Sequence, residues 1–214
     1  IQIENIYEIY TNNSYDAPFP RRPLILEITF ANEQLFIINN HYKAYDDDGN
    51  EDRRRQASIY LKTYIDSYLP NENVIVIGDL NDELTDSEVD NVFWNFISDP
   101  AGYSFVDMEI AEGSPDFWSY PTYGTSGSHI DHILVTNELF DNIETVNTVL
   151  YEEELTDGWY EYEQYISDHR PVYVSICMDE YDECGVCAGN NADDLGCGCF
   201  EPAALSYCDD TDGD

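Results

Sequence analysis

The chain has 214 residues, of which 45 are Asp or Glu and 8 are Lys or Arg, so its formal charge at pH 7 is −37. Hydrophobic residues make up 43% and aromatic residues 14%, enough apolar material for a core, which argues against disorder over most of the chain. No apolar run approaches the ~18–20 residues of a membrane span. The acidic excess excludes an electropositive nucleic-acid surface over the whole molecule.

The first predicted elements are two strands, residues 24–30 and 35–40, with a short polar turn between them, a pattern typical of a hairpin. Residues 52–69 carry apolar side chains at a helical period, and the helix is expected to end at Pro70. Residues 74–77 are a continuous β-branched run of the kind that forms a buried strand.

The second half of the chain continues the mixture of strands and helices. Residues 86–97 have apolar side chains at the i, i+3, i+4, i+7 and i+8 positions of a helix. Residues 109–129 are rich in Gly, Ser, Pro and aromatics, and so long a loop is expected to have a function. Further strands are predicted at residues 130–136, 143–151 and 171–176. The mixture predicts an α/β layered fold.

Four polar segments lie beside these predicted strands. They are residues 39–41, 78–82, 128–132 and 167–171. Side chains at strand ends in an α/β sheet converge on one rim. The segments offer carboxylates for a hard divalent cation, an amide to orient a ligand, and imidazoles for proton transfer. A nucleophile elbow, a Gly-rich phosphate loop and a Cys–His pair are missing from the sequence, so the set indicates metal-assisted attack of water on an acidic ester.

In their order and spacing, the motifs resemble the endonuclease/exonuclease/phosphatase superfamily of deoxyribonuclease I-like enzymes, and most of all its bacterial secreted nuclease branch. The resemblance runs from about residue 6 to residue 176, and its motifs are residues 19–23, 40–43, 78–81, 130–133 and 167–171. Each motif alone is weak, whereas five in the right order are specific. The resemblance implies the C-terminal half of a four-layer α/β sandwich of the deoxyribonuclease I type, followed by an acidic Cys-rich tail.

The resemblance implies that three residues bind the substrate phosphate. His41 is expected to contact the scissile phosphate, and Arg21 matches a phosphate-side arginine. Asp79 and Asn81 are expected beside the attacking water and the phosphoryl oxygens. The resemblance leaves open whether Asp79 is the base or the acid. The residues implied to bind phosphate are Arg21, His41 and Asn81.

The remaining catalytic groups come from the last two motifs. His169 is implied at the reacting phosphate, and Asp131 is its partner that fixes the tautomer of the ring. Asp168 is the implied metal ligand. The expected metal is Mg²⁺ or Mn²⁺, with Ca²⁺ as a further candidate, because a divalent cation and an imidazolium neutralise charge on the phosphoryl oxygens.

The chain departs from the family pattern before His41. The family domain starts with a first half that gives an Asn and a Glu to the metal, and a further Glu to the phosphate-side histidine. Glu4 and Glu8 do not fit, because they lie in what resembles mid-domain sequence. Residues 1–178 are therefore expected to be the second half of the catalytic domain, poorly stable and inactive alone.

Simpler roles compete with several of these assignments. Asp79 and Asn81 are also common turn formers after a strand. His132 is expected to be structural, the role of His129 is left open, and residues 53–55 are expected to be a solvated helix start. Packing is the first expectation for the aromatics of two loops, with stacking on nucleobases as the alternative. These aromatics are Trp118, Tyr120, Tyr123, Trp159, Tyr160 and Tyr162.

Residues 179–214 form a separate acidic segment with 11 of the 45 acidic residues and none of the 8 basic ones. All six cysteines lie from Cys177 onward. The spacing is poor for zinc, and no histidine follows His169, so disulfides and an oxidising compartment are expected. Six cysteines allow about 15 pairings, which the sequence leaves open. Residues 209–214 resemble the start of a Ca²⁺-binding Asp-rich repeat, and the segment is similar to linker or surface-attachment repeats of secreted marine bacterial proteins.

The leading hypothesis is a secreted bacterial, metal-dependent phosphodiester hydrolase that acts as an endonuclease on DNA or RNA. The first alternative is a sphingomyelinase-type phospholipase or phosphatase of the same superfamily. The second is a non-catalytic extracellular Ca²⁺-binding or adhesive module. Four of the eight basic residues adjoin the motifs, which predicts that the scarce positive charge gathers at the rim of the active site. They are Arg21, Arg22, Lys43 and Arg170.

Overall fold

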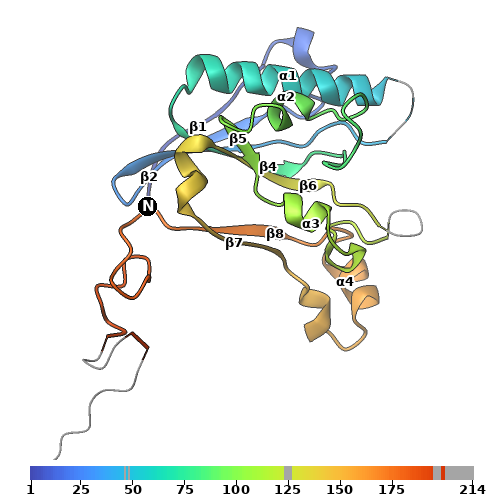
Figure 1. The fold of residues 1–214 in the computed structure, drawn as a ribbon. Coiled ribbons are helices and arrows are strands. Elements are labelled where there is room, and N and C mark those ends of the chain that lie inside the picture. Colours follow the sequence, from blue (N-terminus) through green and yellow to red (C-terminus); the bar gives the residue numbers. More distant parts are fainter. Residues whose placement is uncertain (46, 48, 123–126, 195–198, 201–214) are drawn as a thin grey trace, which may run out of the picture. The chain divides into compact units, whose positions relative to one another are not determined.

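The computed structural model describes residues 1–45, 47, 49–122, 127–194 and 199–200. The chain divides into two units, Ile1–Ile176 and Cys177–Asp214. The first unit holds all the named strands and helices (Figure 1).

Six strands of the first unit form one mixed sheet in the order β1-β2-β3-β4-β6-β5. Only the β3–β4 pair is parallel among them, and α1 makes the connection between these two strands. The strands are β1 (Gln2–Glu8), β2 (Leu24–Phe30), β3 (Glu33–Asn39), β4 (Asn73–Asp79), β5 (Tyr103–Phe105) and β6 (Asp131–Thr136), and α1 is Asn50–Tyr68. A second antiparallel pair is formed by β7 (Ile143–Thr148) and β8 (Val172–Ile176).

The six-stranded sheet has α1 on one side and the β7–β8 pair on the other (Figure 1). The remaining helices are single turns or little more, and they lie in the connections. They are α2 (Trp94–Ile97), α3 (Met108–Ala111) and α4 (Trp159–Tyr165), with 3-10 turns η1 (Asn13–Tyr15), η2 (Pro115–Phe117), η3 (Asn137–Asn142) and η4 (Tyr151–Glu154). The observed architecture is the mixed α/β fold of the deoxyribonuclease I type that the sequence predicts.

The core lies between the sheet and α1. Alternate strand residues point toward the helix, as the two-residue period of a strand requires. They pack with the apolar stripe of α1 in a cluster that includes Ile25, Phe36, Ile38, Val74, Val76, Leu134, Ala57, Leu61 and Ile65. This burial holds β3 and β4 in parallel, and so places the residues that follow both strands at one edge of the sheet.

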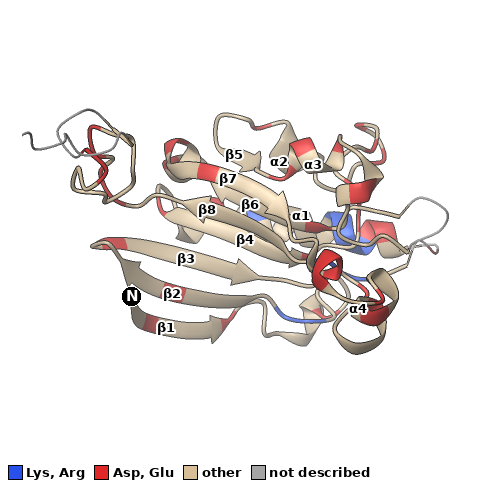
Figure 2. Ribbon diagram, turned by 90° about the horizontal axis from the view of Figure 1, so that it is seen from below, with Lys and Arg blue, Asp and Glu red and all other residues tan. Residues whose placement is uncertain are grey.

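The opposite face of the sheet is apolar but only partly covered. The β7–β8 pair lies over its β4–β6 side and leaves β1 and β2 open (Figure 2). Ile3 is 62% exposed, Ile6 56%, Leu24 40% and Phe30 39%. Four large apolar side chains on two adjacent strands are therefore in contact with solvent.

Most predicted elements are confirmed; the strand over residues 143–151 is shorter than predicted, and the helix over residues 86–97 is largely wrong. The hairpin, the long helix and the strands around residues 74–77, 130–136 and 171–176 are all observed. The predicted strand 143–151 ends at Thr148, and a 3-10 turn follows it. Neither β1 nor β5 was predicted, because β1 lacks a clear period-2 apolar pattern and β5 is only three residues long.

The helix predicted over residues 86–97 is wrong except for its last turn, α2. Polar side chains bind the local backbone instead. Asn91 Nδ2 donates to the Leu84 carbonyl oxygen (2.8 Å), and Asn91 Oδ1 accepts from the Phe93 N–H (2.8 Å). Ser87 Oγ also donates to Asp90 Oδ2 (2.7 Å). These bonds keep the segment in turns, although its apolar spacing is helical.

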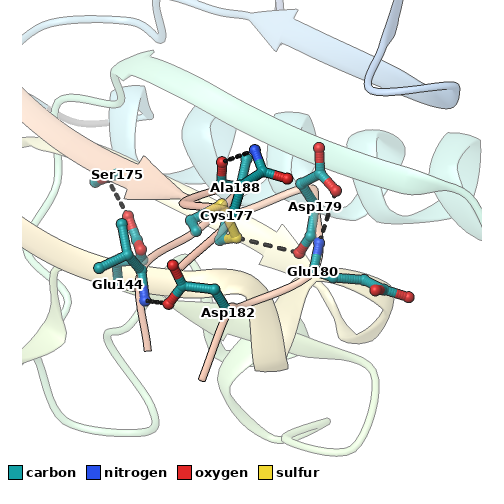
Figure 3. The surroundings of a disulfide bond; sticks show 10 residues. Glu144, Ser175, Cys177, Asp179, Glu180, Asp182 and Ala188 are labelled. Carbon is teal, nitrogen blue, oxygen red and sulfur yellow. Dashed lines mark hydrogen bonds between the residues drawn. A yellow bond between two sulfur atoms is a disulfide. The ribbon is translucent and has the colours of Figure 1, made fainter. Parts of the chain in front are cut away.

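The second unit contains two disulfides, Cys177–Cys187 and Cys184–Cys199. They confirm the expectation of disulfides for four cysteines. Around the first disulfide, Cys177 Sγ lies 3.2 Å from the Asp179 carbonyl oxygen, and the Glu180 N–H donates to Asp179 Oδ1 at 2.8 Å (Figure 3). Cys197, Cys208 and the expected Asp-rich repeat at 209–214 lie outside the described residues.

The Asp182 carboxylate organises the turn between the two disulfides. Its Oδ1 accepts from the N–H groups of Cys184 and Val186, both at 2.9 Å, and its Oδ2 accepts from the Asn191 N–H at 2.8 Å. These backbone hydrogen bonds hold the pKa of Asp182 below its ordinary value. The unit therefore depends on disulfides and a charged turn where apolar content is low.

Candidate active site

The sheet brings three of the polar segments to one edge. Parallel β3 and β4 end side by side, so His41 follows one strand and Asp79 closes the other. β6 runs the opposite way, and its first residue, Asp131, pairs directly with Asp79. His169 comes from the loop between α4 and β8. The ligating atoms of Asp79, Asp131 and His169 lie within 4.8 Å of one another.

Asp131 and His169 form a close pair. His169 Nδ1 lies 2.7 Å from Asp131 Oδ2, so this nitrogen donates to the carboxylate and only Nε2 is left for a ligand. Burial alone would lower the pKa of His169, but the hydrogen bond and charge of Asp131, together with the charges of Asp79 and Asp168, raise it above 6.5. The imidazolium form is therefore favoured.

The loop that carries His169 is fixed by local contacts. The His169 N–H donates to Ser167 Oγ at 3.0 Å, and Tyr162 Oη of α4 donates to the His169 carbonyl oxygen at 3.2 Å. The Tyr120 ring stacks on the imidazole, with centroids 4.5 Å apart and an interplanar angle of 17°. Asp168 is exposed, and it lies near enough for its charge to raise the pKa of both His169 and Tyr120.

The second carboxylate of the site, Asp79, contacts His41 and Asn81. Its Oδ2 lies 3.4 Å from His41 Nε2, and its Oδ1 accepts from the Asn81 N–H at 3.0 Å. Burial and the neighbouring Asp131 charge raise the pKa of Asp79. Burial lowers the pKa of His41, and the Arg21 charge adds to this effect although Asp79 opposes it. The pKa values of His41 and His169 are therefore shifted in opposite directions, and the neutral form is favoured in His41.

The backbone before and after Asp79 has an unusual conformation. Gly78 has φ +143°, and a Cβ at this position would lie 1.8 Å from the Asn40 carbonyl oxygen. Asn81 has φ +55°, a region that Asn tolerates better than most residues. Asn81 Nδ2 also donates to the Tyr42 carbonyl oxygen at 3.3 Å. The close approach of β3 to β4 at Gly78 brings the His41 and Asp79 segments together.

A cleft of about 430 Å³ opens beside these residues. Its lining includes Asp79, Asn81, Tyr120 and His169. The same lining holds Arg54, which pairs with Asp82, and the further acidic residues Glu51, Glu83, Asp86 and Asp90. Burial, together with the Asp82 charge, raises the pKa of Asp86 to about 6. Acidic side chains therefore outnumber basic ones in the lining of the cleft.

Two of the four basic residues expected at the rim are neutralised by acidic partners. Arg22 pairs with Glu8 (3.7 Å) and Asp16 (3.9 Å). Arg170 pairs with Glu152 at 2.5 Å, and its guanidinium lies over the Trp159 ring. Both arginines are therefore paired with carboxylates, and their charge is largely neutralised within the protein. Figure 2 shows the few Lys and Arg segments in blue among many acidic ones in red.

Arg21 and Lys43 differ from the two paired arginines. Lys43 Nζ donates to the Ala44 carbonyl oxygen and lies 5.0 Å from the centre of the Tyr45 ring. Arg21 lies close enough to His41 for its charge to lower the histidine pKa, and its side chain makes no ion pair or hydrogen bond with any other described residue. Arg21 is therefore available to an anionic ligand.

The expectation of a solvated helix start at residues 53–55 is wrong for Arg54, which is only 2% exposed. Its Nε donates to Asp82 Oδ2 at 2.6 Å, and its Nη1 donates to the carbonyl oxygens of Lys43 and Tyr45. Arg54 therefore ties α1 to the two loops that border the cleft. The sequence hides this role because residues of the same type, the half-buried Arg53 and Arg55, lie on either side of Arg54.

A buried triad of Asp107, His129 and His132 lies behind the site. His129 Nε2 lies 3.0 Å and His132 Nδ1 2.7 Å from Asp107 Oδ2. His132 Nε2 donates to the Asp82 carbonyl oxygen at 2.9 Å, so both of its nitrogens face acceptors and carry protons. Asp107 has no recognisable sequence motif, and we did not predict it. The structural role expected of His132 is observed.

The triad is a hydrogen-bond network and does not suit a metal ion. The Ser119 N–H donates to His129 Nδ1 at 3.2 Å, which requires a lone pair on that nitrogen and a proton on Nε2. A metal on Nε2 would require the opposite tautomer. Burial opposes both charges, but Asp107 raises the pKa of His132, and the two histidines lower the pKa of Asp107. Asp107 and His132 therefore form a buried ion pair.

The loop aromatics are mainly packed. Trp118 Nε1 donates to the Ile110 carbonyl oxygen at 3.1 Å, and Trp159 stacks on Tyr162 with ring centres 5.3 Å apart. Tyr160 is 66% exposed. Tyr123 lies outside the described residues. Packing, the first expectation, holds for both tryptophans.

The mixed α/β sheet, with carboxylates and a paired imidazole at one edge, defines a deoxyribonuclease I-like fold. The chain belongs to the Endonuclease/Exonuclease/phosphatase family, whose model matches residues 7–169. Members of this superfamily are hydrolases that act on phosphodiester or phosphate bonds. No curated protein matches this chain in sequence.

Three solved structures share this fold. TDP2 of D. rerio, complexed with single strand DNA product, has a TM-score of 0.58 at 20% identity, and the match covers 81% of this chain and 67% of that one. The 3'-5' exonuclease NExo from Neisseria meningitidis has 0.59 at 17% identity, covering 81% and 71%. An AP endonuclease from Archaeoglobus fulgidus has 0.60 at 13% identity, covering 82% and 71%.

The donor chemistry at this edge fits a hard divalent cation. Asp79, Asp131 and Asp168 supply carboxylate oxygens, and Asn81 an amide oxygen, which are the ligands that Mg²⁺ and Mn²⁺ prefer. Nucleases of the family generally use divalent metals. Among the described residues, no helix is long and apolar enough to span a membrane.

Proposed function

We propose that this protein is a divalent-metal-dependent phosphodiesterase whose substrate is nucleic acid, acting as an endonuclease on DNA or RNA. The observation that carries the proposal is the Asp131–His169 pair directly beside Asp79 and Asn81. Family membership and the DNA product held by the TDP2 structure support it.

In this proposal, His169 acts on the phosphoryl group through Nε2. Asp131 occupies Nδ1 and stabilises the imidazolium, so Nε2–H is directed to the substrate in a defined tautomer. A charged donor at this point neutralises negative charge that develops on the phosphoryl oxygens. Arg21 and neutral His41 would bind the same phosphate from the opposite side.

Asp79 is the group suited to exchange a proton with the attacking water. Its raised pKa brings the carboxyl group closer to the working pH, where general acid or base catalysis is efficient. The Asn81 N–H fixes one oxygen of this carboxylate. The second N–H of the Asn81 amide, beyond the one donated to Tyr42, is available to a phosphoryl oxygen.

Asp168 is the residue proposed to hold Mg²⁺ or Mn²⁺, with Ca²⁺ as a further candidate. When bound, the ion would supply charge neutralisation on the phosphoryl oxygens. Mg²⁺ usually keeps several waters, so one or two carboxylates of the chain are sufficient contacts. The expectation that an Asn and a Glu from a preceding half of the domain complete this site stays a prediction.

The acidic lining of the cleft supports a second candidate, a phosphatase or a sphingomyelinase-type phospholipase. A long polyanion that ran past Glu83, Asp86 and Asp90 would be repelled, whereas a single phosphoester group would reach Arg21 and His169 alone. Phe117, in the loop that could serve as a lipid-binding hairpin, is 50% exposed. The third candidate, a non-catalytic adhesive or Ca²⁺-binding module, requires that His169 have no effect on any activity.

We also propose an extracellular, bacterial location, with surface attachment through the second unit. Disulfides form and persist in oxidising compartments. The bonds Cys177–Cys187 and Cys184–Cys199 support this, as does the acidic surface, which suits solubility in a salty exterior.

The deciding experiment compares plasmid nicking with sphingomyelin and phosphomonoester hydrolysis, in Mg²⁺, Mn²⁺ or Ca²⁺. It uses the 214-residue chain and the same chain extended by its upstream coding sequence. Nicking that His169→Ala abolishes and that the surface control Glu112→Gln retains supports the endonuclease. Cleavage of only a lipid or a monoester selects the second candidate. Nicking that is unchanged in His169→Ala would overturn the catalytic proposal.

A further inference from the structure

Ser119 is fully buried beside the candidate site and lies outside every motif that led to it. Three of its polar groups bind different parts of the structure. Its N–H donates to His129 Nδ1 (3.2 Å), and its carbonyl oxygen accepts from the Arg170 N–H (2.7 Å). Its Oγ accepts from the N–H groups of Ile130 and Asp131, both at 3.2 Å. One residue therefore contacts the backbone on both sides of the Asp131–His169 pair.

The neighbour of Ser119 extends the same arrangement. Tyr120 exchanges backbone hydrogen bonds with Ser128, both at 2.9 Å, and its ring stacks on His169. The Ser119–Tyr120 dipeptide thus joins the start of β6, the loop before β8 and the imidazole ring itself.

Ser119 is itself held by the buried triad. Its N–H partner, His129, is fixed through Nε2 by Asp107, whose other oxygen, Oδ1, accepts from the Ile133 N–H at 2.9 Å. Ser119 is thus connected through His129 and Asp107 to the backbone of β6. A rigid, fully hydrogen-bonded support of this kind is what holds functional groups in place.

We propose that Ser119 is a positioning residue that sets the geometry of the Asp131–His169 pair. The proposal rests on the proposed function for its effect on catalysis, and on geometry alone for its effect on the pair. Asp131 and His169 belong to separate segments, so their 2.7 Å contact needs a common support. Ser119 supplies it, because Oγ holds the Asp131 backbone and the carbonyl holds the residue after His169.

Ser119→Ala tests this proposal, because it removes only the oxygen that holds the Asp131 backbone. Ser58→Ala is a matched control: Ser58 is also fully buried, and its Oγ donates to Asn95 Oδ1 at 2.7 Å, on α1 and outside the site. Ser119→Thr keeps the hydroxyl and serves as the conservative rescue.

Two measurements are made on each variant. The first is the downfield proton resonance of the His169 Nδ1–H, identified by its loss in His169→Ala and recorded without substrate. The second is kcat and KM, as functions of pH, for bis(p-nitrophenyl) phosphate with Mn²⁺. Ser119→Ala is expected to shift or broaden the resonance and to lower kcat by about 10- to 100-fold with little change in KM, since small misplacements of a catalytic group have this size of effect.

Ser58→Ala should leave the resonance and the pH profile as in the wild type, and Ser119→Thr should restore both toward the wild type. An unchanged resonance and kcat in folded Ser119→Ala would overturn the proposal. If the wild type cleaves no phosphoester, the proposed function fails, and the resonance alone then decides the role of Ser119.

Discussion

His169 Nδ1 lies 2.7 Å from Asp131 Oδ2, although 38 positions separate the two residues. The pair joins the first residue of β6 to a loop that follows α4, and Asp79 is opposite Asp131 in the sheet. The Asp131 carboxylate therefore binds Nδ1 of the imidazole, and Nε2 is left available for another ligand. The proposed mechanism depends on this contact, because it leaves Nε2 as the ring nitrogen available to a substrate.

Asp131→Asn tests that dependence. The amide keeps the shape of the side chain but removes the charge that raises the pKa of His169, so the imidazolium should be lost at a lower pH than in the wild type. We expect kcat to fall by about 10²–10⁴-fold near neutral pH. The measurement is kcat against pH on a phosphodiester, with Asp141→Asn as an exposed control. A profile identical to that of the wild type would rule out the pairing role.

Gly78→Ala tests the close approach of β3 and β4. The added Cβ would meet the Asn40 carbonyl oxygen at 1.8 Å, and φ of +143° is unfavourable for any side chain. We expect a loss of about 3 kcal/mol or more in the free energy of unfolding, measured by urea denaturation.

Gly49→Ala is the matched control for this change. Gly49 also has a positive φ (+92°), but a Cβ there has no atom within 4 Å. The only cost of Gly49→Ala is therefore the strain of a positive φ in a residue with a side chain. A loss of about 1 kcal/mol is expected. Equal losses in the two variants would show that contact with Asn40 is unimportant.

The elements that the sequence predicts well are those with strong local patterns. The hairpin of β2 and β3, the helix α1 and the buried strand β4 have clear periodicity and breakers. Their strand-end motifs also meet in space as expected, since the ends of parallel β3 and β4 share one edge with the start of β6. Chain order and strand direction were sufficient for that inference.

The supporting residues of the site could not be predicted in the same way. Asp107 and Ser119 act through buried contacts with residues ten or more positions away, and an isolated Asp or Ser in a loop has no pattern that reveals this. Arg54 is hidden because two arginines flank it. The missing helix over residues 86–97 has a related cause, since hydrogen bonds of Asn91 outweigh a helical apolar spacing.

The buried Asp107–His132 pair predicts a pH dependence of stability. The pKa of Asp107 is lowered, so its stabilisation is present above its ordinary pKa of 3.8 and is lost as pH falls through the folded-state pKa. The pKa of His132 is raised, so its stabilisation is present below 6.5 and is lost as pH rises through the folded-state pKa. The pair therefore contributes most between about 3.8 and 6.5.

Asp107→Asn should destabilise the protein by about 3–5 kcal/mol in that window, because it leaves His132 buried without its counter-charge. The difference from the wild type should shrink above the folded-state pKa of His132, where both proteins hold a neutral ring. Urea unfolding at three pH values measures it, with Asp141→Asn as the control. A difference that is constant from pH 5 to pH 9 would contradict the ion pair.

The open apolar face on β1 and β2 predicts dye binding by the 214-residue chain. Ile3, Ile6, Leu24 and Phe30 are exposed on adjacent strands, and contiguous apolar patches on a folded protein usually contact another surface. We expect 8-anilinonaphthalene-1-sulfonate fluorescence to rise with the folded chain and to fall in Ile6→Lys/Phe30→Lys, without a loss of more than about 1 kcal/mol in stability, since these side chains are largely in water already. Val89→Lys, which changes an isolated exposed side chain elsewhere, is the control and should keep the dye signal.

An extension by the upstream coding sequence should abolish the fluorescence if that segment covers the face. Equal dye binding by the extended chain would show that the face stays open.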